Sequence, residues 1–112
     1  MKTKEIYLQR AIVEALNYSG CLVWRMNAGT VFVGNPKRMI KVGPAGLSDI
    51  IGIHKKTGRF VAIEVKNPGK EKNVTDLQRQ FLENIREAGG ITGVATSVDE
   101  AQEMITKYQE LT

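Results

Sequence analysis

The stretch FVAIEVK, residues 60–66, is apolar except for two charged residues near its end. It predicts a buried strand, and because strand side chains alternate between faces, Glu64 and Lys66 lie on the same face. Their positions are roughly 6.5–7 Å apart along such a strand. Charged side chains are rarely buried without partners. A carboxylate and an ammonium at the end of an apolar strand therefore indicate a functional site.

A second apolar stretch, GLSDIIGI at residues 46–53, has Asp49 near its start. The turn-like KKTG at residues 55–58 predicts that the two stretches form a hairpin, with Asp49 near Glu64 at one end of a small sheet. Neighbouring carboxylates repel each other, and a hard divalent cation relieves the repulsion. An isolated E-x-K pattern is common at solvated strand ends, but Asp49 on the neighbouring strand favours a metal-dependent phosphodiesterase site.

Length and composition indicate a single soluble domain over residues 1–112. No apolar run reaches the roughly 20 residues that span a bilayer, and residues 1–5 lack the apolar core of a signal peptide. Cys21 is the only cysteine and is expected to be a small buried hydrophobe. We therefore expect an intracellular, cytoplasmic protein without membrane contact. The net charge of +4 is modest and only weakly favours an anionic partner.

Periodicity along the chain predicts an α/β fold with a mixed β-sheet flanked by helices and a β-hairpin after the first strand. We expect helices at residues 3–19, 75–88 and 97–108, and strands at residues 21–27, 30–33, 38–42, 46–53, 60–66 and 91–95. Capping boxes begin the second helix at Thr75 and the third at Ser97. Trp24 is assigned to the core, Leu77 to the buried face of the second helix, and His54 to the surface.

In order and spacing, several motifs resemble the PD-(D/E)xK nucleases, and most closely their VRR-NUC (virus-type replication-repair nuclease) branch. They are E-x-x-L-Q at residues 5–9, WRMNAG at 24–29, G-x-x-G-x-S-D at 43–49, E-x-K at 64–66 and T-x-x-Q at 75–78. Ser48 stands where the superfamily name has proline, while the acid that follows is kept. The resemblance covers most of the chain and implies a restriction-endonuclease-like core.

The resemblance also implies metal-dependent cleavage of DNA. Asp49 and Glu64 would be ligands of Mg²⁺, for which Mn²⁺ would substitute, and Lys66 would position or activate the attacking water. A backbone carbonyl near Val65 is expected to be a further ligand. Glu5 matches the acid on the first helix that supports the site in this family. Glu14 is the alternative, although it lies close to Gly20 for the family's spacing and reads as a solvated helix residue.

Gln78 has two readings, as a site residue and as the N3 partner of the capping box at Thr75. Basic residues in loops and at strand ends flank the acids, and phosphate contacts explain this better than solubility alone. The expected DNA-binding residues are Arg25, Lys37, Arg38, Lys41, Lys70 and Lys72.

The resemblance to small stand-alone members of the family favours a homodimer that cuts branched DNA, as Holliday-junction resolvases do, in a phage or mobile-element setting. Apolar residues of the hairpin at 31–42 are the expected dimer interface. The alternative is a non-catalytic module that keeps the nuclease fold for DNA binding or dimerisation. Asp49, Glu64 and Lys66 argue against it, because binding a polyanion does not require acids.

Overall fold

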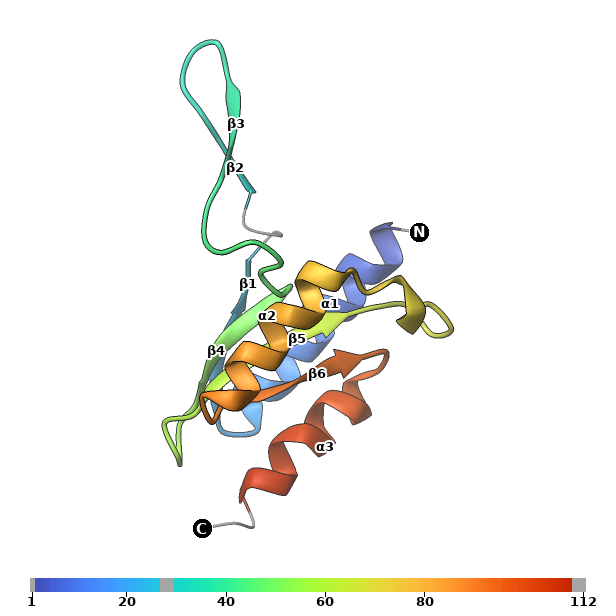
Figure 1. Cartoon of the computed structure of the whole chain (residues 1–112). Helices are drawn as coiled ribbons and strands as arrows, with labels where there is room; N and C mark the ends of the chain where they lie inside the picture. Colours follow the sequence, from blue (N-terminus) through green and yellow to red (C-terminus); the bar gives the residue numbers. More distant parts are fainter. Residues whose placement is uncertain (1, 27–29, 110–112) are drawn as a thin grey trace.

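The computed structural model describes residues 2–26 and 30–109, and it has the predicted α/β architecture (Figure 1). The helices are α1 (Lys2–Tyr18), α2 (Asp76–Glu87) and α3 (Val98–Gln109), with a short 3₁₀ turn η2 (Glu71–Asn73) before α2. The strands are β1 (Cys21–Arg25), β2 (Thr30–Val33), β3 (Arg38–Lys41), β4 (Ile50–His54), β5 (Phe60–Val65) and β6 (Ile91–Ala95). Asn27, Ala28 and Gly29, which end the predicted first strand and its motif, lie outside the described residues.

Four strands form a mixed sheet in the order β1-β4-β5-β6. The stretches around Asp49 and Glu64 form the predicted antiparallel hairpin, in which Ile50 of β4 pairs with Ile63 of β5. β6 lies parallel to β5, and α2 connects the two strands. This topology puts β5 in the interior of the sheet and explains why its sequence is almost continuously apolar.

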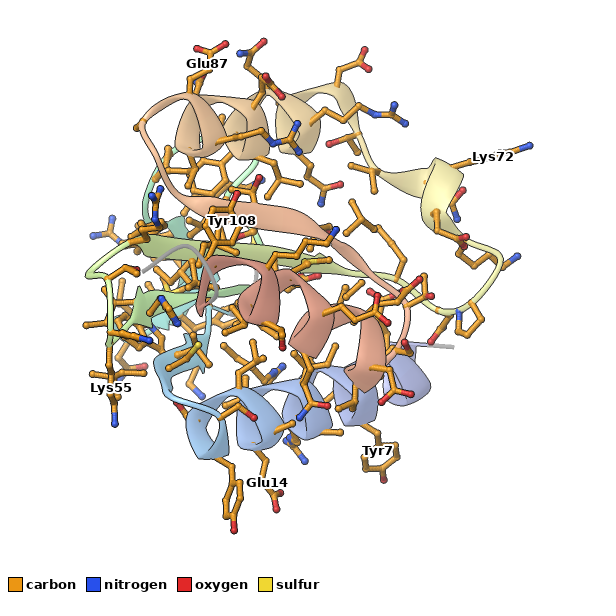
Figure 2. All side chains as sticks on the ribbon, turned by 90° about the horizontal axis from the view of Figure 1, so that it is seen from below. Tyr7, Glu14, Lys55, Lys72, Glu87 and Tyr108 are labelled. Carbon is orange, nitrogen blue, oxygen red and sulfur yellow. The ribbon has the colours of Figure 1, made fainter. Side chains whose placement is uncertain are left out.

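Helices cover both faces of the sheet, with α2 on one face and α1 and α3 on the other (Figure 2). Val61, Ile63 and Val65 of β5 are fully buried in the core formed with α1 and α3. Ala62, on the opposite face of β5, packs with Phe81 and Leu82 of α2. By strand alternation Glu64 faces the α2 side, where the polar end of that helix can reach it.

The hairpin of β2 and β3 is a separate antiparallel sheet that projects away from the body of the molecule (Figure 1). It leaves β1 and returns to β4 at the end of the sheet where Asp49 lies. Its apolar side chains have little cover, and those at least one-third exposed are Val31, Phe32, Val33, Met39 and Ile40. The predicted excess of apolar residues on this hairpin is therefore confirmed as exposed surface.

Trp24 and Leu77 are not core residues, in contrast to the prediction. Trp24 is 47% exposed and Leu77 is 60% exposed. Trp24 lies on the edge strand β1, and its side chain is on the face of the sheet that α2 covers elsewhere. Because α2 packs against β5 and β6, it leaves the β1 part of this face open. The open part of this face, which we call the open sheet face, carries Leu22, Trp24, Ile53 and Phe60.

His54 is fully buried, so its assignment to the surface is wrong. It ends β4 directly opposite Cys21 of β1, whose predicted burial is confirmed, and both side chains face the core under α1 and α3. Nδ1 of His54 lies 2.7 Å from the Thr57 hydroxyl, and burial is the first cause of its lowered pKa. The turn at residues 55–58 folds this ring inward, which the sequence position alone did not indicate.

Both predicted capping residues accept a bond from their helices. The Thr75 hydroxyl accepts from the Gln78 amide, and the Gln78 side chain accepts from the Thr75 amide, which completes the first box. The Ser97 hydroxyl likewise accepts from the Glu100 amide, but the Glu100 carboxylate accepts from Thr96 instead of Ser97. Within residues 2–26 and 30–109, no helix is both long and apolar enough for a transmembrane span.

Candidate active site

Glu64 is the centre of the candidate site and is only 2% exposed. One of its oxygens, Oε2, accepts a hydrogen bond of 2.9 Å from Nε2 of Gln78 and lies 3.7 Å from the Lys66 ammonium nitrogen. Both charged side chains therefore lie on the same face of the β5 strand and its extension. The other oxygen, Oε1, is buried and has no hydrogen-bond partner among the described residues.

Asp49 immediately precedes β4 and lies beside the end of β5. Its Oδ2 accepts a hydrogen bond of 2.8 Å from the Val65 amide, which fixes the carboxylate against the neighbouring strand. Its backbone carbonyl accepts from the Met26 amide at 2.8 Å, which ties the same residue to the end of β1. Asp49 is therefore held from both sides, with its carboxyl group directed toward Glu64.

Burial and the neighbouring Asp49 carboxyl group make ionisation of Glu64 costly. Burial, followed by the negative charge of Asp49, raises the pKa of Glu64 to about 8, and Lys66 offsets only part of this effect. Burial also raises the pKa of Asp49, against the lowering effects of the Val65 amide and of the charges on Lys66 and Arg25. The titrations of Glu64 and Asp49 therefore depend on each other. The site thus has too little positive charge to hold both groups ionised at neutral pH.

Gln78 connects this pair to the first turn of α2. Its backbone amide and its side-chain oxygen complete the capping box with Thr75, and its side-chain nitrogen donates to Glu64. The two readings of Gln78 are therefore compatible in one conformation. The contact orients the Glu64 carboxylate, while a part for Gln78 in catalysis stays a prediction.

Arg25 and Gln9 form a second polar contact near the pair, which the sequence analysis did not assign to the site. Nε of Arg25 donates to Oε1 of Gln9 at 2.8 Å, and the guanidinium lies close enough to Asp49 to lower its pKa. Gln9 is 7% exposed on α1. Gln9 lies one helical turn before Ile12, which is buried on the same face of α1, and this position was the available signal, because a polar residue on a buried helix face needs a partner.

Glu5 and Glu14 differ in their surroundings. Glu5 is half-buried in the first turn of α1, whereas Glu14 is exposed and points away from the sheet (Figure 2). In the part of the chain that the structure describes, no three or more histidine, cysteine, aspartate or glutamate side chains come together as a metal cluster. Asp49 and Glu64 are thus a pair of acids, and the supporting role of Glu5 stays a prediction.

The other predicted DNA-binding residues lie on two projections that flank the acid pair. Lys37 and Arg38 are at the tip of the β2–β3 hairpin, and Lys41 is at its base. Lys70 and Lys72 lie in the loop between β5 and α2, where Lys72 extends into solvent (Figure 2). All five are exposed, unlike the half-buried Arg25.

Comparison with protein families identifies the domain. The family model of the VRR-NUC domain matches residues 3–99. The chain belongs to the VRR-NUC family. No curated protein matches the chain. The VRR-NUC match runs from α1 to the start of α3 and includes Asp49, Glu64, Lys66 and Gln78.

Membership of the VRR-NUC family implies a nuclease-type function, and hence contact with nucleic acid. The mixed four-stranded sheet with helices on both faces is compatible with the restriction-endonuclease-like fold that the sequence predicted. In this VRR-NUC domain the acid pair lies where the carboxyl end of β5 meets the start of β4, between α1 and α2. The polar and charged residues around this end of the sheet form its candidate active site.

Proposed function

We propose that this VRR-NUC domain is a metal-dependent DNA endonuclease that hydrolyses phosphodiester bonds at Asp49 and Glu64. The observation that carries the proposal is the electrostatic state of Glu64. Its carboxyl group is buried beside a second carboxyl, its pKa is raised to about 8, and Oε1 has no partner among the described residues. A divalent cation would replace the proton and satisfy this oxygen.

The donor set fits such a cation. Two carboxylates are a common protein contribution to Mg²⁺, which takes its other ligands from water and phosphate oxygens. Asp49, Glu64 and the Val65 carbonyl would hold Mg²⁺, or Mn²⁺ in its place. When bound, the ion would act as a Lewis acid toward the scissile phosphate and the attacking water.

The remaining residues have separate tasks in the proposed reaction. The Lys66 ammonium, 3.7 Å from Glu64, would hold the water and stabilise negative charge on the phosphate. Gln78 would keep Glu64 in its orientation. Arg25, held by Gln9, would keep positive charge near Asp49. Lysines and arginines of the two flanking projections would bind phosphates farther along the DNA.

We further propose that the substrate is branched DNA and that the protein acts as a homodimer. The β2–β3 hairpin and the open sheet face both expose apolar side chains, and the hairpin projects away from the sheet of its own chain (Figure 1). The hairpin of one copy on the open sheet face of another would cover both surfaces with two-fold symmetry. Two symmetric sites would suit the paired strands of a four-way junction.

Incubation of the pure protein with a labelled four-way junction and with linear duplex tests the proposal. Cleavage of the junction is expected with Mg²⁺ or Mn²⁺ and not with EDTA, and the linear duplex should be cut more slowly. A non-catalytic binding module, the alternative, would bind both DNAs and cut neither under any of these conditions. Equal cleavage of both DNAs would keep the nuclease and reject the preference for branches.

A further inference from the structure

A pocket of about 450 Å³ adjoins the acid pair on the α2 side. It is lined by residues 41–47, which lead from the β2–β3 hairpin toward Asp49, and by Thr75, Leu77 and Gln78 at the start of α2. Its volume is within the range of roughly 300–1,000 Å³ that is typical of ligand sites. We propose that this pocket receives one unpaired nucleotide of the DNA, next to the phosphate that is cut.

The pocket and the candidate active site share two parts of their walls. Gln78 lines the pocket and also donates to Glu64 at 2.9 Å. Leu47 also lines the pocket and is two residues before Asp49. A strand whose phosphate lies at the acids would therefore pass close to the mouth of the pocket.

A close backbone contact shapes the floor of the pocket. Gly46 has a φ of +76°, and a Cβ atom at this position would overlap the Leu77 carbonyl. The loop therefore packs directly on the backbone of the first turn of α2, which only glycine permits. The pocket is thus preformed between two fixed elements, as ligand sites usually are.

The lining suits the face of a nucleobase. Val42 is 46% exposed and Leu77 is 60% exposed, although a leucine at this helix position would ordinarily be covered. Lys41 is the only cation among the lining residues, none of which is acidic. An apolar surface beside a single positive charge matches a base with its phosphate.

Hydrogen bonds hold Thr75 and Gln78 in place at the edge of the pocket. The two residues bond to each other in the capping box, and one Nε2 proton of Gln78 is donated to Glu64. Because most of the remaining lining is apolar, we expect the pocket to hold a base by its face and to accept any of the four bases. Selectivity comes instead from the cost of unstacking, which is smallest for a nucleotide that is already unpaired. This inference rests on the proposed nuclease function and defines its substrate as DNA with an unpaired nucleotide at the cut.

Fluorescence of 2-aminopurine tests the pocket directly. The base analogue is placed at successive positions on either side of the cleavage site, and emission is measured in Ca²⁺ to prevent cutting. A several-fold rise is expected at one position, where the base leaves its stack. Leu77→Ala should abolish this rise, whereas Tyr7→Ala, which truncates a similarly exposed side chain on the outer face of α1 (Figure 2), should retain it.

Cleavage kinetics give a second readout in Mg²⁺. Removal of the base at that position should lower kcat/KM of the wild type about tenfold, because base contacts in single-strand sites contribute on this scale. Leu77→Ala should cut the abasic and normal substrates at equal rates. Cleavage by the wild type without an emission rise at any position overturns the pocket and leaves the nuclease proposal standing. A wild type that cuts no DNA overturns both.

Discussion

The substitution Glu64→Gln tests the buried acid pair without changing its shape. The folded-state pKa of Glu64 is raised from 4.5 to about 8, so in the absence of metal this group costs stability as the pH rises through that window. At 1.36 kcal/mol per pKa unit, the ionised carboxylate lowers the free energy of unfolding by about 4 kcal/mol at pH 8. About 2 kcal/mol of this decrease in the free energy of unfolding occurs between pH 6 and pH 8. The raised pKa of Asp49 acts in the same direction.

Thermal unfolding in EDTA measures the effect. One kcal/mol shifts the Tm of a domain of this size by about 4 °C, so the Tm of Glu64→Gln relative to wild type should rise by about 8 °C from pH 6 to pH 8. Glu14→Gln, which removes an exposed carboxylate on the outer face of α1, is the control and should follow the wild type. Parallel Tm curves for wild type and Glu64→Gln over this range would refute the argument about Glu64.

Three further outcomes follow from other parts of the molecule. Lys66→Ala should lower the cleavage rate at saturating DNA by roughly 10²-fold, with little change of DNA affinity in Ca²⁺. Lys70→Ala combined with Lys72→Ala should instead weaken DNA binding and reduce the salt slope of the affinity by about two units. A wild-type cleavage rate for Lys66→Ala would contradict its assigned role. Burial lowers the pKa of His54, so the stability that the neutral ring contributes is lost as the pH falls below 6.5. The Tm of wild type should therefore fall relative to that of His54→Asn between pH 6.5 and pH 5. An unchanged Tm difference over this range would contradict the effect assigned to His54. Phe32→Asp, at a 66% exposed hairpin position, should convert the dimer to a folded monomer by light scattering, and a wild type that is already monomeric at tens of micromolar would reject the dimer.

Local patterns predicted much of this fold and the meeting of the two acids. The turn between β4 and β5 fixes the antiparallel pairing, and the pairing brings Asp49 to the end of β5 beside Glu64. Strand alternation then places Lys66 next to Glu64. These relations involve neighbouring strands and short loops, for which the sequence carries direct signals.

The relations that were missed depend on how distant elements cover one another. Alternation correctly separates the faces of β1, but it does not reveal that α2 leaves the face with Trp24 open. The contact between Gln9 and Arg25 joins α1 to β1 through their tertiary packing, and the inward rotation of His54 depends on the turn that follows it. The pocket beside Gln78 likewise needs the loop at Gly46 to meet α2.

The most direct test of the proposed metal centre is an anomalous difference map from crystals of the protein soaked in Mn²⁺. A metal centre at the acid pair predicts a peak between the carboxylates of Asp49 and Glu64, within ligand distance of the Val65 carbonyl, and no such peak in crystals of Glu64→Gln. A wild-type map without a peak at these side chains, from crystals in which the site is open to solvent, would contradict the central claim.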